Sequence, residues 1–264
     1  MNLPKVNVVI CNYNYGKWIL GAISSAINQT YPNISITVVD DQSTDDSWQI
    51  LQKNLFRNRT HENLSNQNFE HKKVFIDGPI AKNIEINVIR LAKNSGPSQA
   101  RNVALELGIN NNNDIFAILD ADDEMYENKI SRCVQELLQA NSIGAVYADY
   151  DIYNTNQNII TREYKEVFSK NRLYESCIVH SGAVIKKQAL VDTKEETGFY
   201  DYRIKGPEDY DLWLRISDKF MILHIPESLT LVRQTGLNIS SSNHQEFSEN
   251  YKKGFEIIRS KRGM

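Results

Sequence analysis

The chain has 264 residues, of which 41% are hydrophobic, and it carries a formal net charge of −3 at pH 7. This is enough apolar material to fill the core of one large or two small domains. A slightly acidic chain with a pI near 6.0 gives no reason to expect a nucleic acid as partner, so any phosphate site must be a local one.

The cysteines and the N-terminus indicate the compartment. Cys11, Cys133 and Cys177 are odd in number and far apart, which argues against a disulfide framework and is typical of a reducing environment. The N-terminus lacks a basic region followed by an apolar run, and no window reaches ~18 apolar residues. We therefore expect a cytoplasmic location.

The first half of the chain alternates between strand and helix patterns. Short runs rich in β-branched residues predict strands at residues 6–11, 34–39, 84–91 and 115–119. Apolar residues at helical spacing predict helices at residues 19–27, 97–107 and 130–138, with a further helix after Thr44. Residues 57–83 are a polar interruption, which we expect to be a surface excursion with some structure of its own. The alternation predicts a parallel sheet with right-handed crossovers.

The second half of the chain has a mixed pattern. A hairpin is predicted at residues 144–153 and 158–164, a strand near 184, a helix at 207–217, and two short strands at 221–226 and 229–233. An apolar stripe predicts a final amphipathic helix at residues 241–264. The expected fold class is therefore α/β, with a mostly parallel central sheet flanked by helices and a mixed C-terminal half.

Polar residues follow the predicted strands at the points where they end. They are Cys11-Asn12-Tyr13-Asn14, Asp40-Asp41 and Asp120-Ala121-Asp122-Asp123. In an open parallel sheet, ligands bind beyond the carboxyl ends of the strands. The first of these loops lacks the G-x-G-x-x-G pattern of dinucleotide-binding folds, so phosphates would have to be bound by another group.

The acidic cluster suggests that a metal ion is this group. Side chains two apart on an extended chain point the same way, so Asp120 and Asp122 could face one ion. Carboxylate oxygens suit Mg²⁺ or Mn²⁺, whose remaining positions could take a diphosphate. The alternative interpretation is an acidic surface turn after a strand.

Four segments together resemble the family 2 glycosyltransferases, which are inverting enzymes of the GT-A fold. They are VNVVICNYNYGKWILGAISSAINQTYPNISITVVDDQSTDDS, LAKNSGPSQARNVALELG, FAILDADDE and GPEDYDLWLR, in family order. The resemblance covers roughly residues 5–235. It implies a single GT-A-like domain over residues 1–240, with a donor half at about 1–125 and an acceptor half at about 126–240.

The resemblance assigns the donor-side residues. Cys11 and Tyr13 would line the nucleobase pocket, and Asp41, or its neighbour Asp40, would accept the imide N–H of uracil. Uridine is favoured, but guanine also offers N–H groups, and dTDP-sugars are a further alternative. Arg101 would lie near the ribose and diphosphate, and Asp120 near the ribose.

The metal and acceptor residues also follow from the resemblance. Asp122, with Asp123 as a second candidate, would bind Mn²⁺ or Mg²⁺. Asp209 would be the general base, and Glu208 and His180 would lie on the acceptor side. A helix start would lower the pKa of Asp209, whereas burial and Glu208 would raise it, and the sequence leaves this balance open.

The implied function is the metal-dependent transfer of one sugar from a nucleotide-diphospho-sugar to a glycan or lipid-linked acceptor in surface polysaccharide or glycolipid synthesis. A single transfer is expected because no Trp follows Arg233, so the R-W signature of processive members is missing. The alternatives are a nucleotidyltransferase and a non-catalytic sugar-nucleotide binding module. Basic residues beside the final apolar stripe would also suit peripheral docking on the inner face of a membrane.

Overall fold

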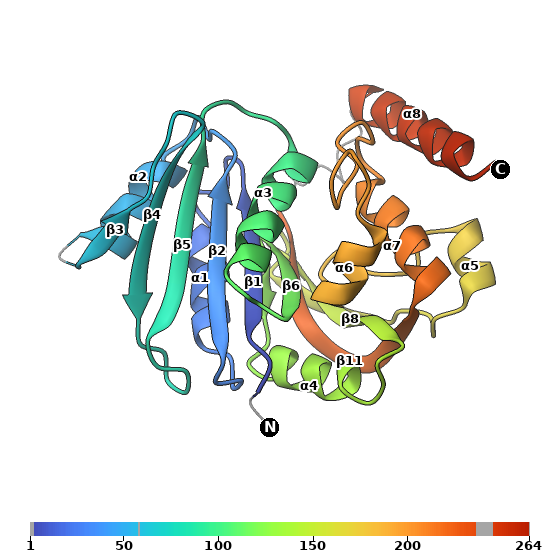
Figure 1. The fold of residues 1–264 in the computed structure, drawn as a ribbon, viewed down its shortest axis with the longest axis horizontal. Helices are drawn as coiled ribbons and strands as arrows, with labels where there is room; N and C mark the ends of the chain where they lie inside the picture. Colours follow the sequence, from blue (N-terminus) through green and yellow to red (C-terminus); the bar gives the residue numbers. More distant parts are fainter. Residues whose placement is uncertain (1–2, 58, 236–244, 264) are drawn as a thin grey trace.

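The computed structural model describes residues 3–57, 59–235 and 245–263, and these form an α/β fold around one large sheet (Figure 1). Within the described residues the sheet has eleven strands, in the order β3-β4-β5-β2-β1-β6-β10-β8-β11-β7, with β9 paired to β8. The central strands are β5 (Ile84–Leu91), β2 (Ile34–Asp40), β1 (Val6–Asn12) and β6 (Ile115–Asp120). These four are parallel, as predicted.

The sheet becomes mixed beyond β6. The strands on this side are β7 (Glu124–Met125), β8 (Ile143–Asn154), β9 (Ile159–Glu163), β10 (Val184–Lys186) and β11 (Met221–Gln234). β10 is antiparallel to both β6 and β8, whereas β11 is parallel to β8. The expectation of a mixed C-terminal half is therefore confirmed.

Helices cover both faces of the sheet, because the buried strands are apolar on both sides. The helices are α1 (Ile19–Ile27), α2 (Ser47–Leu51), a π-helical turn (Gln52–Phe56), α3 (Pro97–Asn110), α4 (Lys129–Leu137), α5 (Lys170–Glu175), α6 (Lys187–Thr193), α7 (Glu208–Lys219) and α8 (Gln245–Arg262). On β1, Val8 and Ile10 join the core under α1, α2 and α4, whereas Val9 joins the core under α3, α6 and α7. This alternation is what a strand buried on both faces requires.

Two local predictions need correction or refinement. The polar interruption at residues 57–83 includes β3 (His61–Asn63) and β4 (Phe69–Ile76). β4 extends the sheet antiparallel to β5, and β3 pairs antiparallel to β4. The prediction of two short strands around Pro226 was wrong, since β11 is one strand with register shifts on both sides of Ser228. Pro has no N–H for the ladder, and the shifts fall where it interrupts pairing.

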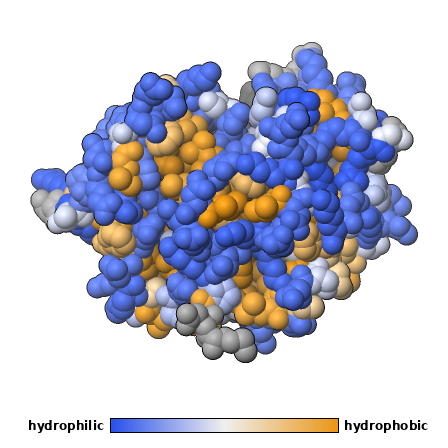
Figure 2. Space-filling model, viewed as in Figure 1, coloured by the Kyte–Doolittle hydropathy of each residue, from blue (hydrophilic) through white to orange (hydrophobic). Residues whose placement is uncertain are grey.

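Helix α8 begins at Gln245, and the earlier residues 241–244 of the predicted C-terminal helix lie outside the described part of the chain. Its partly buried Phe255 and fully buried Ile258 pack against the core beneath α7. The apolar stripe thus faces the parent domain. Figure 2 shows that hydrophilic residues cover most of the viewed face, with apolar residues visible in patches between them. None of the helices described is long and apolar enough to cross a membrane.

Candidate active site

The polar strand ends meet at one edge of the sheet. In the parallel register, Asn12 at the end of β1 pairs with Asp40 at the end of β2, and Cys11 pairs with Asp120 at the end of β6. Residues distant in sequence are therefore neighbours here. The edge carries several carboxylates that were predicted to lie together.

Asp40 is fully buried and bonded within the protein. Its carboxylate accepts the Asn12 side-chain amide at 2.9 Å, and its other oxygen lies 3.4 Å from Nε of Arg90. The Ser43 hydroxyl donates to it as well. Asp40 therefore orders the loop after β2, and Asp41 is the better candidate for a direct ligand contact.

Asp41 holds the loop that leads into α3. One carboxylate oxygen accepts the Ser95 amide at 2.8 Å and the other accepts the Gly96 amide at 2.7 Å. Gly96 has φ +86°, a conformation that Gly adopts without strain. Burial raises the pKa of Asp41 despite these two amides. Each oxygen keeps a lone pair with which it could accept an N–H from a base.

Cys11, Tyr13 and Tyr15 line the same edge. Burial raises the pKa of the Cys11 thiol to about 12, with nearby Arg101 opposing the shift, so the thiol stays neutral. Tyr13 is 43% exposed and available to a planar ligand. Burial and then the charges of Asp122 and Asp120 raise the pKa of Tyr15, which therefore lies with the acids. Sequence reasoning missed Tyr15, which follows Tyr13 by two residues in a loop where Asn14 has φ +62°.

Arg101 on α3 links the two halves of the protein. Its Nη2 donates to Asp120 at 3.1 Å and its Nη1 donates to Glu208 at 2.8 Å. The guanidinium carbon lies 5.3 Å from the ring centroid of Tyr200. Arg101 is thus a buried cation fixed between a carboxylate at the end of β6 and one at the start of α7, and a contact with the diphosphate stays a prediction.

Asp122 and Asp123 are both buried beside Asp120. Burial, and then the charge of Asp120, raises the pKa of Asp122 to about 7. The same two causes raise the pKa of Asp123, whose Oδ1 accepts the Arg233 amide at 2.9 Å. Because burial disfavours the charged form of both carboxyl groups, a cation at this place would favour their ionisation.

The donor set fits a hard divalent cation that keeps other ligands. Within the described residues no group of three or more His, Cys, Asp or Glu side chains is arranged to hold a metal ion. Mg²⁺ and Mn²⁺ are commonly held by one or two carboxylates together with water and phosphate oxygens. Asp122 and Asp123 could supply these carboxylates, and metal binding by either of them stays a prediction.

Lys129 at the start of α4 is a second cation that sequence reasoning missed. It is 2% exposed, and its Nζ donates to the Thr230 hydroxyl at 2.7 Å. Burial lowers its pKa, and the charge of Asp123 opposes the shift. Lys129 matters to the charge of the site because it is buried, and nothing in the local sequence predicts that burial.

His180 lies against Tyr150, with ring centroids 4.4 Å apart, and its Nδ1 accepts the Gly182 amide at 3.0 Å. Burial, and then the charge of Lys129, lowers the pKa of His180 to about 3. The ring is therefore neutral at physiological pH. It can offer a stacking surface and one N–H, and its acceptor-side role stays a prediction.

Asp209 is the second residue of α7. Its Oδ1 accepts the amide of Tyr210 at 2.7 Å, and its other oxygen has no hydrogen bond within the described residues. Burial, and then the charge of Glu208, raises the pKa of Asp209 to about 7, with Arg101 opposing the shift. The sequence left open whether the helix start or burial would determine the pKa of Asp209, and in the structure burial has the larger effect. A carboxylate with this pKa is well matched to proton transfer at neutral pH.

Solved structures with the same architecture define the class of protein. The structure of S. aureus TarS 1-349 in complex with UDP-GlcNAc matches with a TM-score of 0.64 at 18% identity, over 97% of this chain and 66% of that one. The mannosyltransferase PcManGT from Pyrobaculum calidifontis, in complex with GDP-Man and Mn²⁺, also gives a TM-score of 0.64, at 16% identity, over 98% of this chain and 64% of that one. The fold is that of the GT-A glycosyltransferases, as predicted.

The chain belongs to glycosyl transferase family 2, whose model matches residues 7–68 and 58–192. Among curated relatives, the chondroitin synthase of Escherichia coli is 28% identical over 84% of this chain. This chain spans only 28% of that protein's length. The Escherichia coli UDP-Glc:alpha-D-GlcNAc-diphosphoundecaprenol beta-1,3-glucosyltransferase WfgD is 26% identical over 80% of this chain and 69% of its own length. Membership of this family argues against the nucleotidyltransferase alternative.

Proposed function

We propose that the protein transfers one sugar from a UDP-sugar to an acceptor hydroxyl, with inversion at the anomeric carbon and with the help of Mn²⁺ or Mg²⁺. The observation that carries the proposal is the chain of contacts from Asp120 through Arg101 to Glu208, beside Asp209. It joins the acidic edge of the sheet to the start of α7, where the pKa of Asp209, about 7, suits a general base.

The donor would bind along the carboxyl ends of β1, β2 and β6. Tyr13 would lie against the base, and Asp41 would accept its N–H, while Cys11 adds a neutral wall. UDP is favoured because the TarS structures contain UDP or UDP-GlcNAc, whereas GDP-Man in PcManGT keeps a GDP-sugar as the alternative. Asp41 serves either base, since both present N–H donors.

Asp122, with Asp123 as the second candidate, would hold the divalent cation. When bound, such a cation offsets the charge that develops on the departing diphosphate. The chain's own contribution is to bury these carboxylates beside Asp120. Tyr15, with its raised pKa, stays protonated beside them and can donate a hydrogen bond.

Asp209 would remove the proton from the attacking hydroxyl. The hydroxyl oxygen forms the new bond to the anomeric carbon on the face opposite the diphosphate, the bond to the diphosphate oxygen breaks, and the proton moves to Asp209. Inversion requires this single displacement. Burial keeps Asp209 basic enough to accept the proton. The ion pair with Arg101 holds Glu208 in place beside it.

The acceptor is proposed from the relatives. WfgD acts, by its name, on a diphosphoundecaprenol-linked sugar, and the other named relative is a chondroitin synthase. We therefore place this chain in polysaccharide synthesis with a glycan or lipid-linked acceptor, at the cytoplasmic side and with peripheral membrane contact during transfer. His180 and Tyr150 are the aromatic pair that could receive the acceptor sugar.

The experiment is Asp209→Asn in the purified protein with Mn²⁺ and a panel of UDP-sugars. We expect transfer to fall by about a thousandfold while UDP affinity measured by calorimetry changes less than about twofold. Asp192→Asn, at an exposed position on α6, is the matched control and should keep full activity. Loss of UDP binding in the Asp209 variant would instead assign that residue to structure. Tight UDP binding by the unmodified protein, without turnover on any donor, would support the binding-module alternative.

A further inference from the structure

Helix α8 packs closely on the segment that leads into α7. A Cβ added at Gly206 would lie 2.6 Å from Cδ2 of Tyr251, and one added at Gly254 would lie 2.7 Å from Cδ of Pro207. Real Cβ atoms do not approach other atoms so closely, so glycine is needed on both sides of this contact. The backbone of each glycine therefore packs directly against a ring of the other segment: Gly206 against Tyr251, and Gly254 against Pro207.

The same helix also packs on the residue after Asp209. The ring centroids of Tyr210 and Phe255 lie 5.6 Å apart, and Ile258 one turn further on is 1% exposed. The Tyr210 amide donates to the Asp209 carboxylate, so a shift of Tyr210 would move a hydrogen-bond donor of that carboxylate. Helix α8 thus contacts the chain immediately on both sides of the proposed base.

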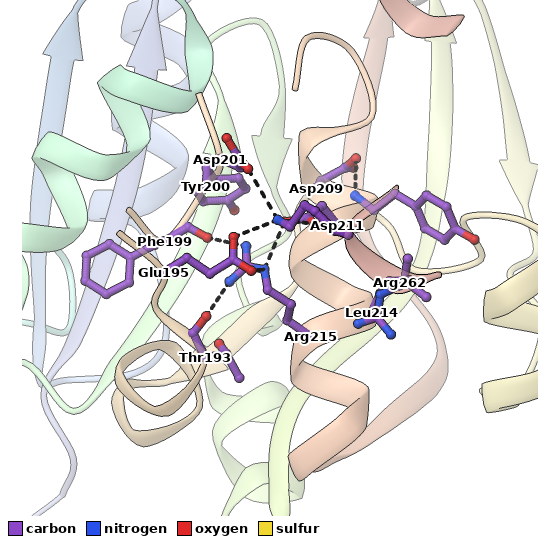
Figure 3. A network of polar contacts seen from close by, with 12 residues as sticks. Thr193, Glu195, Phe199, Tyr200, Asp201, Asp209, Asp211, Leu214, Arg215 and Arg262 are labelled. Atoms are coloured by element: carbon purple, nitrogen blue, oxygen red, sulfur yellow. Dashed lines mark hydrogen bonds and ion pairs between the residues drawn. The ribbon is translucent and has the colours of Figure 1, made fainter. Parts of the chain in front are cut away.

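Lys261 joins the end of α8 to a polar network whose members Glu195, Asp211 and Arg215 are shown in Figure 3. Its Nζ lies 2.6 Å from Glu195, 2.8 Å from Asp211 and 3.3 Å from Asp201. Asp201 and Asp211 are fully buried, and Arg203 and Arg215 complete the network by pairing with Asp201 and Asp211 respectively. Three carboxylates from two segments are therefore balanced by three cations, one of which comes from α8.

The network continues to the centre of the candidate active site. Asp201 follows Tyr200, whose ring lies beneath the guanidinium of Arg101. The Tyr200 backbone is held by Asn102, which donates to its carbonyl and accepts its amide at 2.8 Å each. Arg101 in turn fixes Glu208. Lys261 is thus connected to the start of α7 by α8 itself and by the loop that carries Tyr200.

We propose that α8 is a positioning element for the general base, with the Gly254–Pro207 contact setting its distance from α7 and Lys261 locking it in place. This inference rests on the proposed function of Asp209. Neither Gly254 nor Lys261 is expected to touch the donor or the reacting atoms, so both are positioning residues. The helix would act on the rate of transfer and leave donor binding to the first half of the chain.

The test compares Gly254→Ala and Lys261→Met with Lys252→Met, an exposed residue of the same helix with no ion pair in the described part of the chain. Alanine is the better helix former, so any harm from Gly254→Ala must come from the clash with Pro207. We expect kcat to fall about ten- to hundredfold in both variants, because misplacement of a reacting group by about 1 Å costs that much. UDP affinity should be unchanged, Lys252→Met should behave as the unmodified protein, and Lys261→Arg should restore activity.

Hydrogen exchange gives a second measurement that does not depend on catalysis. Amides of residues 208–212 should exchange faster in Gly254→Ala and in Lys261→Met, while those of β1 and β2 should not change. Faster exchange with an unchanged kcat would overturn the positioning role, as would unchanged exchange in both variants. If the unmodified protein shows no transfer with any donor, the proposed function fails instead, and the exchange result still reports whether α8 holds α7.

Discussion

Replacement of Arg101 by Met tests the link between the two halves of the protein. The guanidinium is 8% exposed and bonded to Glu208 and Asp120, so methionine keeps much of the apolar stem and removes only the charge and its hydrogen bonds. Glu208 is 7% exposed, and its Oε2 is buried without a hydrogen-bond partner. In the variant, Glu208 would be a buried carboxylate that has lost its cation.

The expected loss of stability comes mainly from Glu208. Removing one partner of a buried ion pair costs about 3–5 kcal/mol. The side chain of Asp120 is 37% exposed, and solvent screening leaves its share below about 1 kcal/mol. At about 2–4 °C per kcal/mol for a chain of this size, a loss near 4 kcal/mol lowers the Tm by roughly 8–16 °C. Arg101→Met combined with Glu208→Gln should recover about half of the loss, because the uncompensated charge is gone.

Thermal and urea unfolding of the four proteins of this double-mutant cycle give the coupling energy. A coupling below about 0.5 kcal/mol would refute the reasoning, since neighbours in one ion-pair network should couple more strongly. A kinetic readout is independent of stability. Arg101 opposes the raised pKa of Asp209, so its removal should move the acidic limb of the pH profile of kcat/KM to higher pH.

Two further predictions concern titration. Burial raises the pKa of Asp122 to about 7, so the folded state favours its protonated form. The metal-free protein should therefore lose stability as pH rises from about 4 toward 7. Differential scanning calorimetry should show this decline, Asp122→Asn should flatten it, and a rising Tm over that range would contradict it. Burial raises the pKa of both Cys11 and Cys133 to about 12, so a thiol reagent at pH 8 should modify the folded protein slowly and the urea-unfolded protein quickly. Rapid labelling of the folded protein would show that these thiols are not buried as described.

The sequence was sufficient to predict the parallel centre of the sheet and the edge where its polar residues gather. The reason is that β1, β2 and β6 are continuous apolar runs that end in Asn12, Asp40 and Asp120, and their period and endings are local properties. The single strand β11 was not predictable in the same way, because the local sequence around Pro226 is typical of a break between two strands. Pairing with β8 on both sides of the bulge overrides that signal.

The compensation of charge in the site could not be predicted from the sequence. Arg101 and Glu208 are 107 residues apart, and Lys129 and Thr230 are 101 residues apart. Neither pairing has a local sequence signal, since Lys129 looks like an ordinary charged residue at a helix start. The pKa of Asp209 was open for the same reason, because its burial depends on tertiary packing that only the structure supplies.

The acidic edge brings several buried carboxylates close to the protein's own buried cations. Arg101 offsets Asp120 and Glu208, Arg233 contacts Glu124 and the Asp122 carbonyl, and Lys129 offers a cation whose own pKa burial lowers. Burial nevertheless raises the pKa of both Asp122 and Asp123, and the charge of Asp120 adds to the shift in each case. Carboxylates whose pKa is raised by burial are costly to ionise in the isolated protein. If a divalent cation binds at Asp122 or Asp123, as we propose, it would favour their charged form, and the protein would gain stability from that binding.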